Sequence, residues 1–183
     1  MSNVMTEVLH TRVAYQLSVA KWFIFLGIFS ALSIVLPYAC HQFGVAGIVF
    51  LPMHFAVLLA GMVMGMRGGV VVGLVSPLIS YATSGMPPAV SLFPITVELV
   101  TYGVVAGFMF HSLKKSVLLS LFAALIAGRI VSLALVSFIL GRTGAGNQFH
   151  SLFVLATPGL AIQIVLIPVL VAKITRFLET KDS

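Results

Sequence analysis

Acidic residues are scarce in this sequence. Among its 183 residues there are four, and Glu7, Glu179 and Asp182 lie near the ends of the chain. Glu98 is therefore the single acidic residue of the interior, and the paired carboxylates used in general acid–base catalysis cannot be assembled there. The single cysteine, Cys40, excludes a disulfide framework and a cysteine-built metal site within one chain. Enzymes that depend on either arrangement are disfavoured.

Several nucleotide-binding and catalytic motifs are also missing. The sequence contains no phosphate-binding loop of the pattern Gly, four residues, then Gly-Lys-Ser/Thr, no Gly-x-Ser-x-Gly elbow and no His-Glu-x-x-His zinc motif. We therefore expect no enzymatic activity, no ATP hydrolysis by this chain, no metal and no cofactor. The net charge of +6 does not indicate nucleic-acid binding, because the basic residues flank apolar segments as membrane-anchoring charges do.

Long apolar segments fill most of the chain. Hydrophobic residues make up 60% and charged residues 8% of it, against about 45–50% and about 25% in soluble domains. Apolar helices of this kind cross a hydrocarbon core of about 30 Å, so the sequence predicts an all-α integral membrane protein with six transmembrane helices. The predicted spans cover residues 22–40, 45–66, 68–83, 92–111, 116–140 and 152–172.

The second and third predicted spans are nearly continuous, and together they are too long for one crossing. The simplest explanation is a tight hairpin at Arg67, which divides this stretch into two crossings of the membrane. Residues 1–20 place apolar side chains at helical spacing between polar ones, which indicates a short helix in the membrane interface. We therefore expect one domain over residues 1–183, with an interfacial tail at 1–20 and a six-helix core at 22–178.

Lysine and arginine are distributed unevenly between the two sides of a six-span topology. Apart from Arg129 inside a span, only Arg142 lies on the side opposite the termini. The positive-inside rule then places both termini in the cytoplasm, with the protein in the cell membrane. The basic residues on the side of the termini are Arg12, Lys21, Arg67, Lys114, Lys115, Lys173, Arg176 and Lys181.

Two opposite charges, Glu98 and Arg129, lie inside predicted spans. An ionisable group in the bilayer interior needs a partner, a water-filled cavity or a ligand, so both are candidates for a functional site. The alternative is that they only neutralise each other, and the two interpretations are compatible. Other polar side chains of the spans can meet them in one cavity that opens outward. The candidate substrate-binding residues are His54, Ser80, Glu98, Tyr102, Arg129 and Gln163.

Further hypotheses concern helix faces made of small residues and one loop between two spans. Gly27 and Ala31 share one face of the first span, and this face could meet another protein. The loop between the third and fourth spans combines glycine freedom with proline stiffness, and it is either a plain turn or a lid above the polar residues. The loop residues are Gly85, Met86, Pro87 and Pro88. Close helix packing is expected at the glycines spaced by four residues, which are Gly61, Gly65, Gly69, Gly73, Gly103 and Gly107.

Several linked segments together resemble one family of membrane proteins. They are Leu36-Pro37-Tyr38, His41-Gln42-Phe43-Gly44, Leu51-Pro52-Met53-His54, Leu58-Leu59-Ala60-Gly61, Gly73-Leu74-Val75-Ser76-Pro77-Leu78, Gly85-Met86-Pro87-Pro88, and Glu98-Leu99 followed by Tyr102-Gly103 and Ala106-Gly107. Over residues 22–178 the sequence resembles a substrate-binding S component of an energy-coupling factor (ECF) transporter.

The resemblance implies a six-helix protein that captures a vitamin or vitamin precursor at the outer side of the membrane. It also implies as partners a transmembrane coupling protein and two cytoplasmic ATPase subunits. In this family the loop after the third helix gates the site, which here corresponds to residues 84–92. A face of small residues on the first helix contacts the coupling protein, and here Gly27 stands in place of one of the usual alanines.

The substrate and the mode of energy coupling stay open at this point. Ser2 replaces the histidine that metal-transporting members carry after the first methionine, which disfavours nickel or cobalt. Arg129 and Gln163 suit a carboxylate or a ring carbonyl, and Glu98 suits a hydroxyl or an amine, so pantothenate, riboflavin and a nucleoside-like precursor all fit. One alternative is a stand-alone secondary transporter coupled to protons through Glu98 and His54. Another is a structural membrane subunit without a ligand.

Overall fold

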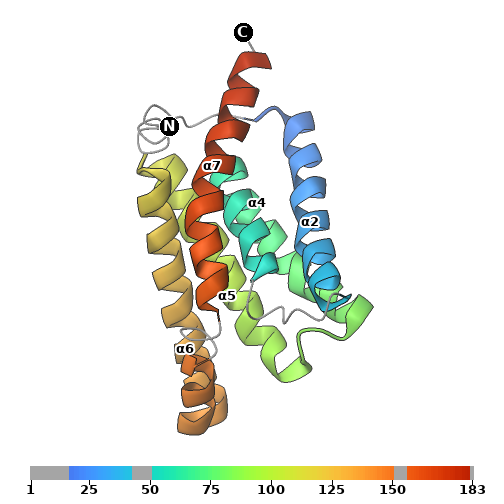
Figure 1. Ribbon diagram of the computed structural model, residues 1–183, viewed down its shortest axis with the longest axis vertical. Helices are drawn as coiled ribbons and strands as arrows, with labels where there is room; N and C mark the ends of the chain where they lie inside the picture. The colour runs from blue at the N-terminus through green and yellow to red at the C-terminus, as the bar shows by residue number, and fades with distance from the viewer. Residues whose placement is uncertain (1–16, 43–50, 151–155, 182–183) are drawn as a thin grey trace.

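The chain folds into a bundle of long helices (Figure 1). The computed structural model describes residues 17–42, 51–150 and 156–181. Within these residues the elements are all helical, which confirms the all-α part of the predicted fold class, and five of the helices are long and apolar enough to cross a membrane. The elements are α2 (Val19–Gln42), α4 (Pro52–Ser84), α5 (Ala89–Gly107), the short π-helix η1 (Phe108–Ser112), α6 (Val117–His150) and α7 (Thr157–Lys181).

Helix α4 is bent back on itself at Gly65, which has φ 79° and ψ −176°. This backbone conformation is open essentially only to glycine, so it interrupts the helix at one residue. A methyl group on either Gly61 or Gly69 would lie 2.6 Å from the carbonyl oxygen of Gly103. Eight residues of straight helix would separate these positions by about 12 Å. The two arms of α4 therefore run in opposite directions beside α5. The break lies two residues before Arg67, where the hairpin was predicted, because the required φ is positive.

Glycines bring the backbones of α4 and α5 into direct contact. A Cβ atom on Gly103 would lie 2.5 Å from the backbone of Gly69, and one on Gly107 would lie 2.4 Å from the backbone nitrogen of Met66. A Cβ atom on Gly73 would meet the backbone nitrogen of Val100 at 3.0 Å. The prediction that these glycines permit close helix packing is confirmed. In a lipid environment such contact is a main source of helix association, because lipid chains are as apolar as the side chains themselves.

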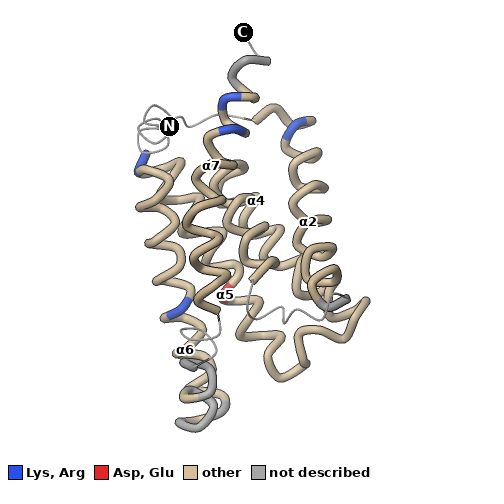
Figure 2. Tube along the Cα trace, in the orientation of Figure 1, with Lys and Arg blue, Asp and Glu red and all other residues tan. Residues whose placement is uncertain are grey.

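The two ends of the bundle differ in charge. Figure 2 shows Lys and Arg gathered at the end where α2 begins and α7 ends, with a further basic residue lower on α6. The loop between α4 and α5 and the start of α7 lie at the opposite end (Figure 1). The bundle thus has a basic end and an opposite end without this cluster of basic residues. Glu98 lies closer to the opposite end.

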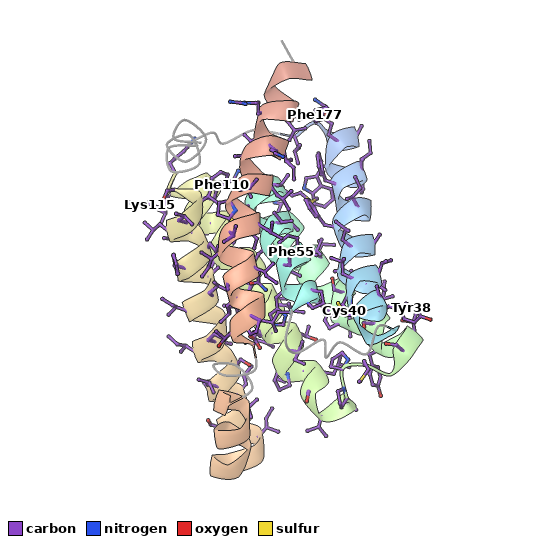
Figure 3. The ribbon with its side chains drawn as sticks, in the orientation of Figure 1. Tyr38, Cys40, Phe55, Phe110, Lys115 and Phe177 are labelled. Atoms are coloured by element: carbon purple, nitrogen blue, oxygen red, sulfur yellow. The ribbon has the colours of Figure 1, made fainter. Side chains whose placement is uncertain are left out.

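The interior of the bundle is built around the first arm of α4. Leu58 and Met62 from this arm are fully buried and pack with Leu99 of α5, Leu121 of α6 and Ile167 of α7. The exterior, by contrast, carries many large apolar side chains. Tyr38 and Phe177 project away from the bundle and are 58% and 61% exposed (Figure 3). An apolar exterior around an apolar interior is what a helix bundle in lipid requires.

The end of the fifth predicted span differs from the structure. The span was predicted to end at residue 140, but α6 continues to His150. Gly141 has φ 68° and ψ −164°, which breaks the helix at a single residue and lets it resume. The predicted interfacial helix at residues 1–20 lies outside the described residues except for its last four, and α2 already begins at Val19.

Candidate functional site

The candidate site is centred on the carboxylate of Glu98, which is 1% exposed in the middle of α5. Tyr102 follows four residues later, and this spacing puts both side chains on the same face of the helix. The Tyr102 hydroxyl donates a hydrogen bond of 2.7 Å to Oε1 of Glu98. A hydrogen bond to a charged acceptor contributes about 1.5–3 kcal/mol, so Tyr102 helps to hold the carboxylate in place.

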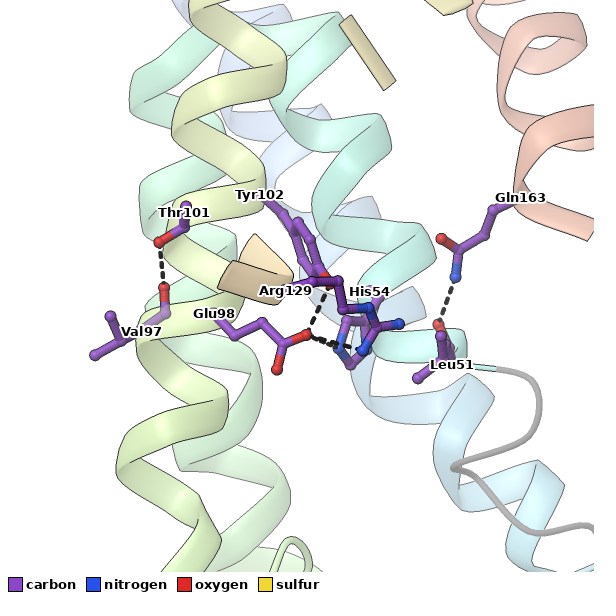
Figure 4. A network of polar contacts seen from close by, with 8 residues as sticks. All are labelled: Leu51, His54, Val97, Glu98, Thr101, Tyr102, Arg129 and Gln163. Atoms are coloured by element: carbon purple, nitrogen blue, oxygen red, sulfur yellow. Dashed lines mark hydrogen bonds and ion pairs between the residues drawn. The ribbon is translucent and has the colours of Figure 1, made fainter. Parts of the chain in front are cut away.

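Two other helices bring further groups to the same carboxylate oxygen. Nη1 of Arg129 on α6 donates to Oε1 of Glu98 at 3.1 Å. Nε2 of His54, near the start of α4, lies 3.6 Å from that oxygen, and the His54 and Tyr102 rings are 5.3 Å apart. One oxygen atom thus gathers groups from three helices (Figure 4). We call His54, Glu98, Tyr102 and Arg129 the Glu98 cluster.

The charges of the cluster are almost completely removed from solvent. The side chains of Glu98 and Arg129 are 2% and 6% exposed, and that of His54 is 12% exposed. Burying an ion costs several kcal/mol, and mutual attraction with good geometry offsets that cost. The interhelical pair predicted from the sequence is therefore present. Its presence alone does not separate a structural role from a binding role.

Gly128 allows Tyr102 to reach its position. A Cβ atom on this residue, which directly precedes Arg129 on α6, would lie 2.3 Å from Cε1 of Tyr102. The Tyr102 ring is fully buried and has neighbours on all sides, so it cannot move away freely. The absence of a side chain at Gly128 therefore determines where the tyrosine hydroxyl lies.

We expect Gly128→Ala to destabilise the protein by about 1–3 kcal/mol, because the added methyl group overlaps the Tyr102 ring in a closely packed interior. The measurement is the midpoint of denaturant unfolding in detergent micelles. Gly146→Ala, on the same helix, is the matched control, because a Cβ atom there has nothing within 4 Å. Equal midpoints for the two variants would contradict the prediction.

Gln163 of α7 contributes an amide to the same region. It is 1% exposed, and its Nε2 donates to the carbonyl oxygen of Leu51 at 3.4 Å. Leu51 precedes α4 in a left-handed conformation with φ 48° and ψ 46°, which is uncommon for a residue with a side chain. Figure 4 shows the other end of the amide, Oε1 of Gln163, turned toward the side on which Arg129 and His54 lie.

Four buried polar atoms of these residues have no hydrogen-bond partner within the described part of the chain. They are Nδ1 of His54, Nε and Nη2 of Arg129, and Oε1 of Gln163. Leaving a buried polar atom unpaired costs about 1–3 kcal/mol, and native proteins contain few such atoms. Their concentration on three neighbouring residues marks this region as one that can take up a polar molecule.

The structure separates Ser80 from the other candidates. It lies on the second arm of α4 and is 6% exposed, and its carbonyl oxygen accepts a hydrogen bond of 2.7 Å from the Ser84 hydroxyl. Among the described residues, its own hydroxyl makes no contact with the Glu98 cluster. The reason is the fold-back of α4, since His54 lies on the first arm. The sequence shows that both residues are polar and lie in predicted spans, but it does not specify which helix face each side chain occupies.

The predicted gating loop and the predicted contact face of α2 both lie at the surface. In the loop, Gly85 ends α4 with φ 69° and donates its N–H to the Tyr81 carbonyl oxygen at 2.9 Å, and Met86 is 43% exposed. On α2, Gly27 and Ala31 are both exposed, and a Cβ atom on Gly27 would have nothing within 4 Å.

Three contributions to the region were not predicted from the sequence. Gly128 sets the place of Tyr102, the Leu51 carbonyl anchors Gln163, and the Ser132 hydroxyl also hydrogen-bonds the Glu98 side chain. The first and third had a usable signal, because both lie within three residues of Arg129 on a helix. A fourth polar contact lies beside the break in α4, where Nε2 of His111 is 2.7 Å from the carbonyl oxygen of Met62.

The hollows found in the described structure lie at the basic end of the bundle. One has a volume of about 880 Å³ and the other of about 390 Å³, and both are lined by Leu17, Trp22, Met66 and Arg67. Neither is lined by the Glu98 cluster, whose members contact one another directly. The outward-facing chamber predicted from the sequence stays a prediction. Among the described residues no three His, Cys, Asp or Glu side chains are grouped to hold a metal ion.

Comparison with known proteins identifies one family. Residues 21–177 match the family model described as the substrate-specific component of the ECF transporter. The match covers most of the chain and includes every member of the Glu98 cluster together with Gln163. Neither a curated protein nor a solved structure shows significant similarity to the chain.

Proposed function

Because the chain belongs to the family of substrate-specific components of ECF transporters, we propose that it captures a water-soluble vitamin or vitamin precursor with high affinity at an outward-facing site. Family members are substrate-binding subunits of membrane transport and not enzymes. The observation that carries the proposal is the concentration of unpaired buried polar atoms beside the Glu98–Arg129 pair, inside apolar helices. A bundle with a purely structural role would be more stable with apolar residues of similar volume at these positions.

In the proposed topology the chain crosses the cell membrane six times, with both termini in the cytoplasm. The two arms of α4 count as separate crossings, since they run in opposite directions from Gly65. The cytoplasmic side is the basic end of the bundle, where Lys21 lies at the start of α2 and Lys173 and Arg176 lie near the end of α7. This assignment follows from the positive-inside rule. It places the loop between α4 and α5 outside.

In the proposed site, the ligand binds to the polar atoms that the contacts within the cluster leave without a partner among the described residues. Arg129 binds an acidic or carbonyl group of the ligand, and Glu98 with Tyr102 and His54 binds a hydroxyl or an amine. The exposed loop from Gly85 to Pro88 serves as the gate that admits the ligand and covers it. Ser80 is left out of this site because it lies on the other arm of α4.

Delivery of the ligand requires partners, because the sequence has no ATP-binding loop of the Walker type. The proposed partners are a transmembrane coupling protein and two cytoplasmic ATPase subunits. The exposed face of α2 around Gly27 and Ala31 is the proposed contact with the coupling protein. Its support is that this face is open, whereas Phe29 and Ser33 on the opposite face are buried against the bundle.

A test of the function begins with the small molecule that co-purifies with the chain in mild detergent, identified by mass spectrometry. Uptake of this compound is then measured in cells that produce the chain with intact or catalytically inactive ATPase subunits. We expect uptake to stop when the ATPases are inactive, and we expect the coupling protein to co-purify with the chain. The absence of any bound small molecule would instead favour a structural subunit.

The contact of 3.6 Å between His54 and Glu98 favours one alternative function, a proton-coupled secondary transporter. Two titratable groups in contact inside a membrane helix bundle can relay protons. The same uptake experiment separates the two functions. Uptake that continues without the ATPases and collapses with the proton gradient would establish the secondary transporter.

We expect Arg129→Ala and Glu98→Ala each to weaken binding of the co-purifying compound by more than about tenfold, or 1.4 kcal/mol, because each removes a charged contact to it. Calorimetry on the purified protein measures this. Ser120→Ala is the matched control, since its buried hydroxyl bonds only to the carbonyl oxygen of Ser116 among the described residues. Unchanged affinity in a folded Glu98→Gln/Arg129→Gln double variant would limit the pair to a structural role.

A further inference from the structure

The unpaired nitrogens of Arg129 form one edge of its guanidinium group. Nη1 binds Glu98, whereas Nε and Nη2 are buried and have no hydrogen-bond partner among the described residues. The N–H bonds of Nε and Nη2 are parallel, and together they make a planar fork that matches two acceptor oxygens on one atom. The arginine is 5% exposed, so this edge faces the interior of the protein and not bulk solvent. The edge is therefore suited to a planar acceptor of two hydrogen bonds.

The orientation of the Gln163 amide follows from its other contact. Its nitrogen donates to the Leu51 carbonyl at 3.4 Å, and a flipped amide would place two oxygen atoms against each other. The unpaired atom is consequently the oxygen, Oε1, which can only accept a hydrogen bond. Gln163 is 1% exposed, and this oxygen is turned toward the side of the Glu98 cluster (Figure 4). A molecule bound there must supply an N–H or O–H donor.

Building on the proposed function, we propose that the substrate is a small monocarboxylate that also carries a hydrogen-bond donor. Its carboxylate lies on the Nε–Nη2 edge of Arg129, and its N–H or O–H group donates to Oε1 of Gln163. Arg129 then bridges two carboxylates, that of Glu98 through Nη1 and that of the substrate through the opposite edge. Arg129 and Gln163 determine specificity. Arg129 selects compounds that carry a carboxylate, and Gln163 selects compounds that carry a hydrogen-bond donor.

Charge balance favours a monocarboxylate over a phosphate group. The charged and titratable groups at the site are Glu98, Arg129 and His54, and the first two neutralise each other. A monocarboxylate adds one negative charge to this neutral pair, whereas a phosphate dianion adds two, and uncompensated charge in a region of low dielectric is costly. Neutral ring systems match the Gln163 oxygen but leave the arginine fork without paired acceptors.

The test measures thermal stabilisation and calorimetric affinity of the purified chain with matched acid and neutral probes. The pairs are pantothenate with panthenol and biotin with its methyl ester. Riboflavin and uridine serve as neutral ring compounds, and oleate serves as a lipid carboxylate without a neighbouring donor. We expect at least one water-soluble acid to bind more than about tenfold more tightly than its neutral partner.

Substitutions connect the selectivity to the two residues. Arg129→Lys keeps the positive charge beside Glu98 but removes the fork, so we expect it to lower affinity for the acid more than about tenfold with little change for the neutral partner. Gln163→Leu should lower affinity for the acid that carries a donor, and Ser120→Ala should leave it unchanged. The proposal is overturned if a neutral compound binds best, if acid and neutral partners bind equally, if oleate binds as tightly as the soluble acids, or if no probe binds.

Failure of this proposal is distinguishable from failure of the proposed function. If uptake depends on the ATPase subunits but the best probe is neutral, the chain is a substrate-capture subunit for another class of compound. If an acid binds selectively but uptake is independent of the ATPases, the substrate class stands and the coupling mechanism is wrong.

Discussion

Replacing Arg129 by methionine should destabilise the protein by about 3–5 kcal/mol, because it leaves the Glu98 carboxylate buried without a cation. The carboxylate would keep the Tyr102 hydrogen bond of 2.7 Å, but it would lose the donor at 3.1 Å. The measurement is the free energy of unfolding in denaturant and detergent micelles. Arg67→Met is the matched control, since Arg67 is exposed beside the break in α4 and this variant should change the free energy by less than about 1 kcal/mol.

A double variant shows whether the charge is responsible. In Arg129→Met/Glu98→Gln both charges are absent, so we expect much of the lost stability to return despite the second substitution. The double variant could instead be no more stable than Arg129→Met. In that case the loss of stability would come from lost packing of the arginine side chain and not from the unpaired carboxylate of Glu98. The recovered double variant also supplies a folded protein for the binding measurement.

Replacing Gly103 by valine should have the other large effect. The position is enclosed by backbone, because a Cβ atom there would lie 2.5 Å from the carbonyl carbon and oxygen of Gly69. The neighbouring backbone cannot rotate away as a flexible side chain can, so α5 must separate from both arms of α4. We expect destabilisation of about 3 kcal/mol or more, at or above the upper end for overpacked interiors. Unfolding in detergent measures it, together with the yield of monodisperse protein.

Gly27→Val is the control for Gly103→Val. Both are glycines inside a helix and both substitutions introduce the same β-branched side chain, but a Cβ atom on Gly27 meets nothing within 4 Å. We expect Gly27→Val to leave the stability within about 1 kcal/mol of the unaltered protein. A similar loss in the two variants would mean that helix propensity dominates, and that the close contact between α4 and α5 is not required.

The two predictions concern residues that pack against α5 or belong to it, since Arg129 of α6 binds Glu98 of α5 and Gly103 lies on α5 itself. Glu98 and Tyr102 lie on a face that meets α4 and α6 with polar groups. Gly103 and Gly107 lie next to them and bring the α4 backbone into contact at the break. The close contact therefore holds His54 of α4 near the Glu98 carboxylate. A change at the glycines should disturb the polar cluster even though it removes none of its members.

Several features were predictable because they depend on local sequence. Apolar segments of membrane-spanning length predicted the helices, and the four-residue spacing of the glycines predicted close helix packing, which the structure places between α4 and α5. Glu98 and Arg129 were recognisable as a pair because an apolar environment makes any isolated charge costly. The helix break was expected near Arg67 for reasons of length, and the structure places it at Gly65, where a positive φ is accessible.

Other features were not predictable because they depend on which faces meet. Ser80 has the polarity of a site residue and is buried, yet no hydrogen bond joins it to the Glu98 cluster among the described residues. Gln163 has a definite amide orientation only because the Leu51 carbonyl, distant in sequence, accepts its N–H. The helical continuation to His150 depends on one residue, Gly141, whose backbone conformation no periodicity reveals.

The sequence by itself determined that this chain is a helical membrane protein with opposite charges in its interior, because hydropathy and charge are properties of each segment alone. Only the tertiary structure decided that one oxygen of Glu98 gathers His54, Tyr102 and Arg129, and that one edge of the arginine stays free. The physical reason is that a hydrogen bond depends on direction and on distances of a few tenths of an ångström. Those are determined by the packing of helices that lie far apart in the sequence.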